Sequence, residues 1–121
     1  MPIDTAQYNE VATQEATIAA SASLSGAIRL PAGHYLAAIV MPAAWTAADL
    51  TFQASPAGTT YNNLYDDNGN EVTVTAAASR FILLPPAEWY AMPFLKIRSG
   101  TSGAAVNQAA ARTLTLVTRP V

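Results

Sequence analysis

One acidic run has the residue types that bind a hard cation. Asp66–Glu71 carries oxygen-bearing side chains at its first, third and fifth positions, which is how a calcium-binding loop begins. The spacing then departs from that loop, because Gly69 stands fourth instead of sixth and Ala77 replaces the bidentate glutamate. Asn68-Gly69 between two apolar runs is also typical of a hairpin turn in which both central residues have positive φ. The sequence therefore predicts a hairpin tip, with a bound cation as the alternative, and we expect no metal site.

A Ser-His-Asp mechanism would have to use His34, the single histidine of the chain. His34 follows the turn Pro31–Gly33 and precedes an apolar run, a setting in which an imidazole is ordinarily solvated or packed. Neither Gly-x-Ser-x-Gly nor His-Glu-x-x-His accompanies it. The carboxylates that could form a glycosidase pair fall mostly in expected turns or at strand ends; they are Asp49, Asp66, Asp67, Glu71 and Glu88. We expect no catalytic residues and no enzymatic activity.

Aromatic residues are the remaining candidates for a site. Flat rings stack on sugar rings, and tyrosine adds a hydroxyl group. The same residue types also fill core corners and subunit contacts. The candidates for contact with a ligand or a partner are Trp45, Tyr61, Trp89 and Tyr90, and Tyr65 is a further aromatic residue of the same kind.

The composition narrows the class of partner. Charged residues make up 12% of the chain, about half of the roughly 25% usual in soluble domains. Six basic residues without a basic run argue against nucleic acid, and the apolar stretch Tyr35–Trp45 is too short to span a bilayer. Without cysteine there is no disulfide or thiolate site, and no cofactor is expected. A weakly charged surface rich in alanine and threonine suits an obligate oligomer or a larger assembly, in which a partner covers it.

The elements that would position these residues are short strands. Leu50–Ser55, Phe94–Ser99 and Arg112–Thr118 alternate apolar and polar residues, and Leu36–Met41 is apolar throughout, as in a strand covered on both faces. Pro85–Tyr90 suits a single helical turn that caps the core with Trp89 or Tyr90. The expected strands are Thr17–Ala20, Gly26–Leu30, His34–Met41, Leu50–Ser55, Asn62–Tyr65, Glu71–Thr75, Arg80–Leu84, Phe94–Ser99 and Arg112–Thr118.

This pattern predicts an all-β fold, an antiparallel two-sheet sandwich or jelly roll of about eight or nine short strands. Residues 1–16 are expected to be an N-terminal arm whose order depends on a partner, although Gln7–Ala20 also has the composition of a short helix. Residues 17–121 would form the sandwich domain.

Several segments resemble a small structural protein of tailed bacteriophages, of the head decoration, cement or head-fibre type. The likeness runs from about Ala16 to the C-terminus and is specific only when its segments are taken together. They are Ile39–Ala48, Leu50–Ser55, Leu64–Gly69, Leu95–Thr101 and Arg112–Pro120.

A second likeness is to the galactose-binding-like jelly rolls. It rests on Phe52, Ser55, Gly58, Tyr61, Leu95, Ile97 and Arg98. Ala57 departs from that pattern, which usually has an acidic residue before the glycine.

The first resemblance implies a structural virion protein that decorates or cements the capsid. Its partner would be the major capsid protein or another virion protein, and its location the capsid surface, after synthesis in the bacterial host cytoplasm. A homo-oligomer is expected, with a trimer favoured because a threefold assembly would match a local threefold axis of the shell. The alternatives are a carbohydrate-binding module for adhesion to a host or glycan, and a tail or baseplate accessory.

Overall fold

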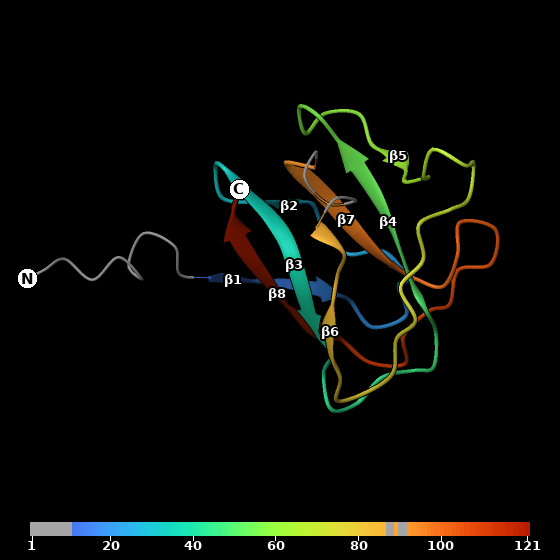
Figure 1. Ribbon diagram of the computed structural model, residues 1–121. Coiled ribbons are helices and arrows are strands. Elements are labelled where there is room, and N and C mark those ends of the chain that lie inside the picture. Colours follow the sequence, from blue (N-terminus) through green and yellow to red (C-terminus); the bar gives the residue numbers. More distant parts are fainter. Residues whose placement is uncertain (1–10, 87–88, 90–91) are drawn as a thin grey trace, which may run out of the picture.

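The computed structural model describes residues 11–86, 89 and 92–121, which form an all-β fold (Figure 1). Two four-stranded sheets, with the orders β1-β8-β3-β6 and β2-β7-β4-β5, enclose one core. All paired strands are antiparallel, so the predicted two-sheet sandwich is confirmed. We call the two sheets, in that order, the first and the second sheet. The strands are β1 (Ala12–Ile18), β2 (Ile28–Arg29), β3 (His34–Val40), β4 (Leu50–Ser55), β5 (Asn62–Asn63), β6 (Phe81–Leu83), β7 (Phe94–Ser99) and β8 (Arg112–Pro120).

The core lies between the sheets and is built from the inward-facing residues of each strand. In β8, Leu114 and Leu116 are fully buried, whereas the preceding residue Thr113 faces outward and is exposed. Hiding a leucine or phenylalanine side chain of this kind contributes about 1.5–3 kcal/mol. The second sheet contributes four fully buried apolar side chains to the same core, Leu50, Phe52, Leu95 and Ile97.

The first sheet begins earlier in the chain than expected. Strand β1 starts at Ala12, not Thr17, and pairs over its whole length with Arg112–Thr118 of β8. Its inward-facing residues include Ala16 and Ile18, both buried. Residues 12–16 are therefore sheet instead of arm, and residues 1–10 lie outside the described part of the chain.

One expected strand is reduced to a bridge. In Glu71–Thr75, Val74 exchanges two backbone hydrogen bonds of 2.9 Å with Leu50, the first residue of β4. Val72 donates to the carbonyl of Leu64, so the segment follows the edge of the second sheet without a continuous ladder. The expected strand Asn62–Tyr65 likewise shortens to β5, with a separate bridge between Tyr65 and Glu71.

No helix within the described ranges is both long enough and apolar enough to cross a membrane.

Candidate functional site

The acidic run is a turn whose first carboxylate binds its own backbone. Asp66 Oδ1 accepts the N–H groups of Asn68 and Asn70, each at 2.9 Å. Gly69 donates its N–H to the Asp66 carbonyl and has a φ of 83°. This is a three-residue hairpin loop, a type I turn followed by a left-handed glycine, and not the turn with two positive φ angles that the sequence predicted. No group of three His, Cys, Asp or Glu side chains in the described residues is placed to hold a metal ion.

His34 joins the ends of strands. Its Nδ1 lies 3.0 Å from Thr118 Oγ1, and Thr118 is fully buried. The Thr118 hydroxyl also lies 3.4 Å from the carbonyl of Ala12. The imidazole therefore bonds the start of β3 to β8, which in turn contacts β1.

Two of the candidate carboxylates hold loops in place. Glu71 is paired with Arg98 at 3.4 Å and accepts the backbone N–H of Ser102 at 3.2 Å. Asp49 Oδ1 accepts the N–H of Ala76 at 3.2 Å. Asp67 is exposed on the hairpin tip, and Glu88 lies outside the described residues. These contacts stabilise the second sheet and its loops.

Arg98 is the centre of a buried polar network. It is 7% exposed, and its guanidinium group donates to Asn63 Oδ1 at 2.6 Å and to Thr51 Oγ1 at 3.2 Å, besides Glu71. A buried charge needs several such partners to offset its lost hydration. Arg98 thus connects β7, β4 and β5 from within the sheet.

The residues of the galactose-binding likeness are internal. Ser55 Oγ accepts the N–H of Gly58 at 2.8 Å, and an added Cβ at Gly58 would meet the Phe94 ring at 2.9 Å. Phe52, Leu95 and Ile97 are core residues. The shared spacing therefore describes a turn and a core.

The aromatic candidates lie in three separate environments. Trp45 is half-buried and donates Nε1–H to the Ala48 carbonyl at 3.0 Å. The Tyr61 ring lies under the Lys96 ammonium group, 4.5 Å from its nitrogen. Trp89 is 1% exposed and packs edge to face on Phe52, with ring centroids 4.8 Å apart. These three rings do not form one stacking platform for a sugar.

The expected helical turn before β7 is described only in part. Trp89 donates its backbone N–H to the Pro86 carbonyl at 3.0 Å, and its side chain caps the core. The candidate Tyr90 lies outside the described residues, as do residues 87, 88 and 91.

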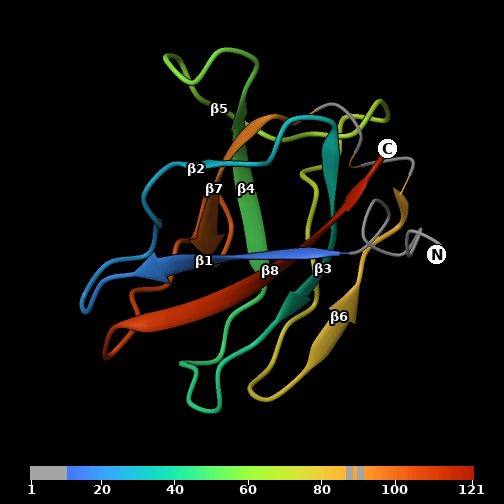
Figure 2. The ribbon, with the colours of Figure 1, turned by 90° about the vertical axis from the view of Figure 1, so that its left-hand side faces the viewer.

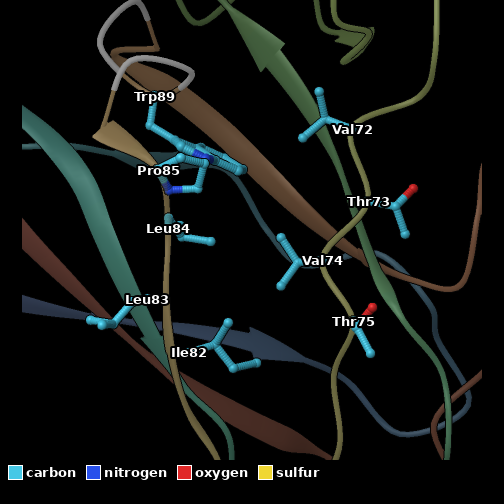
Figure 3. Close-up of a pocket in the computed structure, with 9 residues that line it drawn as sticks. All are labelled: Val72, Thr73, Val74, Thr75, Ile82, Leu83, Leu84, Pro85 and Trp89. Carbon is cyan, nitrogen blue, oxygen red and sulfur yellow. The ribbon is translucent and has the colours of Figure 1, made fainter.

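A cleft of about 320 Å³ opens between the edges of the two sheets. Figure 3 shows one wall made by residues 82–85 and the other by residues 72–75, with the Trp89 indole between them. Ile82, Leu84 and Val74 point into the space, whereas Leu83 points away from it (Figure 3). The Trp89 Nε1–H is buried and has no hydrogen-bond acceptor among the residues that the structure describes. The described residues that line the cleft are mainly aliphatic, and none of them is charged.

The outer face of the first sheet, which is turned toward the viewer in Figure 2, carries the exposed apolar surface. Strand register aligns two cross-strand rows on it. The first row is Glu15, Thr115, Val40 and Phe81, and the second is Thr13, Val117, Ala38 and Leu83.

Polarity changes along both rows. On the β1 side they carry Thr13 and Glu15, and on the β6 side they carry Phe81 and Leu83, which are 62% and 78% exposed. We define the apolar face as Val40, Phe81, Leu83 and Val117. Ala38 lies in the second row between Val117 and Leu83 but is itself buried. The sequence analysis missed this surface. Its signal was the run Phe81–Leu83, in which a strand must turn two of three apolar side chains to one face.

Comparison with known proteins gave no match among protein-family models, curated proteins or solved structures. The fold alone therefore defines the class of this protein, which is an antiparallel all-β sandwich with exposed apolar side chains on the outer face of its first sheet.

Proposed function

We propose that this protein is a structural component of a tailed-phage particle that works by pressing the apolar face against a neighbouring protein. The observation that carries the proposal is the exposure of Phe81 and Leu83, side by side at one edge of the first sheet. The tailed-phage setting comes from the sequence resemblance. The capsid is the favoured location and the major capsid protein the favoured partner.

The chemistry of the face suits protein contact. Phe81 and Leu83 would each contribute about 1.5–3 kcal/mol if fully covered. Half-buried Val40 and Val117 extend the patch into the sheet. Large apolar groups gathered on one rigid surface mark interaction sites in soluble proteins.

The charge distribution supports the same conclusion. The nearest charge in the cross-strand rows is Glu15, which lies on β1 with β8 and β3 between it and Phe81. Covering the apolar part of the two rows therefore buries no charged group, which would be costly. Exposed Arg119 lies two residues beyond Val117 on β8 and faces the same side, so a contact on the apolar face must leave it in water.

A sedimentation experiment tests the proposal. Purified heads and purified tails of the phage that encodes the protein are each mixed with the wild type, with Val117→Lys or with Thr13→Lys, and then pelleted. Wild type and Thr13→Lys are expected to sediment with heads, and Val117→Lys is expected to lose at least about tenfold in affinity, because it buries an unpaired charge. Thr13 is the matched control, since it lies on the same cross-strand row but on the polar side of the face.

Two results would contradict the proposal. One is that the protein stays in the supernatant with both heads and tails. The other is that Val117→Lys, still folded by circular dichroism, binds as well as the wild type. Binding to tails instead of heads would keep the contact role but move it to the tail.

A further inference from the structure

Within the described part of the chain, strand β6 is an edge of the first sheet with no strand paired to its outer side. It bonds to β3 on one side only, and Figure 2 shows it as the last strand of that sheet. Natural edge strands are commonly protected by charged residues, proline or a bulge. The residues of β6 itself are Phe81, Ile82 and Leu83, which supply none of these.

The hydrogen-bond alternation shows which backbone groups face the open edge. Met41 donates to the Arg80 carbonyl at 2.7 Å, and Leu84 donates to the Ala37 carbonyl at 3.0 Å. Arg80 and Leu84, which flank β6, thus turn these backbone groups toward β3. In an antiparallel ladder the residues between them turn theirs the other way. The N–H and C=O groups of Phe81 and Leu83 therefore point out from the edge.

This arrangement complements itself under a twofold axis. If Ile82 of two copies meets at the axis, Phe81 of each copy lies opposite Leu83 of the other, and about four inter-chain hydrogen bonds can form. Arg80 then lies opposite Leu84, so no like charges meet across the pair. The apolar faces of both copies become continuous across the new pair of strands.

The second sheet offers a similar edge beside it. Val74 turns its N–H and C=O toward Leu50, so the backbone groups of Thr73 and Thr75 point the opposite way. A twofold axis perpendicular to the sheets would bring both edges of one copy to the matching edges of the other. The mouth of the cleft between these edges would then be closed by the second copy.

We infer that a second copy of this chain pairs its β6 antiparallel to β6, joining the two first sheets into one eight-stranded sheet. The occupant is a second copy because the edge is its own complement in backbone groups and in apolar side chains, and no like charges meet across it. The inference goes beyond the proposed function, since it names a partner for the edge strand beside the apolar face and leaves that face open to another protein. It favours two copies, where the sequence analysis expected three.

The test is the mass of the purified full chain in solution, measured by light scattering over a concentration series. The wild type is expected to approach twice the monomer mass of 12.7 kDa as concentration rises. Leu83→Pro removes an N–H that points out from the edge and makes no hydrogen bond to β3. Proline is tolerated at such positions of edge strands. It should raise the dimer dissociation constant by at least about tenfold. Leu83→Ala keeps that N–H and should weaken the dimer less than the proline does.

The outcomes separate this inference from the proposed function. The β6 pairing is supported if the wild type is a dimer and Leu83→Pro disrupts it while keeping the circular dichroism of the wild type. A trimer, or a dimer that Leu83→Pro leaves unchanged, overturns β6 pairing while leaving the contact role intact. If Leu83→Pro fails to fold, Phe81→Pro tests the other outward N–H in the same way. A wild-type monomer at every concentration overturns the pairing, whereas the proposed function is decided separately by the sedimentation experiment.

Discussion

At the scale of single residues, the polar side chains that suggested chemistry instead support the backbone. Arg98 joins three strands through Asn63, Thr51 and Glu71. Asp66 forms the hairpin tip by accepting two amide protons. In both cases the residue type indicated a polar interaction, but the spacing along the chain did not reveal that its partners were internal.

Replacing Arg98 tests its structural role. Arg98→Leu leaves Glu71, whose side chain is 14% exposed, without its cation. We expect a loss of about 2–4 kcal/mol in the free energy of unfolding, because a largely buried carboxylate keeps its desolvation cost. Urea denaturation followed by tryptophan fluorescence measures it. Exposed Arg80 is the control, and Arg80→Leu should change stability by less than about 0.5 kcal/mol; equal effects of the two variants would contradict the assignment.

Replacing Asp66 separates a turn from a calcium site. Asp66→Ala should lower the unfolding free energy by about 1–2 kcal/mol, because two turn amides lose their acceptor. Millimolar calcium should leave the melting temperature of the wild type unchanged. A calcium-dependent rise in the wild type that disappears in Asp66→Ala would instead establish the cation alternative.

At the scale of elements, the alternation of side chains predicted most of the sandwich. The expected bounds of Leu50–Ser55 and Phe94–Ser99 coincide with β4 and β7, because their inward residues are large and apolar. Residues 12–16 of β1 were missed, since the outward Thr13 and Glu15 and the small inward Ala12 and Ala16 resemble a polar arm. Glu71–Thr75 was predicted as a strand from its valines, yet only Val74 pairs with β4.

Local pattern could have indicated an exposed apolar side chain in Phe81–Leu83, but not which residues of other strands lie beside it. Val117, Ala38 and Leu83 become neighbours through the pairing of β8, β3 and β6, which are far apart in the sequence. Periodicity places a side chain inside or outside, but register decides which outward side chains share a row.

The loop after β7 offers a prediction at this scale. Gly100 has a φ of 88°, and a Cβ there would lie 2.6 Å from the Ala104 carbonyl oxygen and 2.7 Å from the Val106 nitrogen. Gly100→Ala should therefore cost more than the roughly 1–2 kcal/mol of left-handed strain alone, since backbone atoms must also move. Gly69, with a φ of 83° and no atom within 4 Å of an added Cβ, is the matched control. In chemical denaturation, Gly69→Ala should lower the free energy of unfolding only by the left-handed strain. Equal losses in the two variants would contradict a steric clash at Gly100.

At the scale of the whole molecule, the sandwich has two unlike sides. Polar Thr13, Glu15 and Thr17 lie at the β1 side of the first sheet, and Phe81 and Leu83 lie at the β6 side. The proposed contact would use the β6 side of this sheet. A low fraction of charged residues, 12%, is consistent with a surface that is partly covered in use.

Radical footprinting of the protein, free and bound to particles, tests this account most directly. Phe81 and Tyr65 are aromatic residues of similar exposure, 62% and 52%, on different parts of the sandwich. The account predicts that binding lowers the oxidation rate of Phe81 by several-fold and leaves that of Tyr65 unchanged. Protection of Tyr65 with Phe81 still fully reactive would contradict it, because the particle would then contact the hairpin of the second sheet instead of the apolar face of the first.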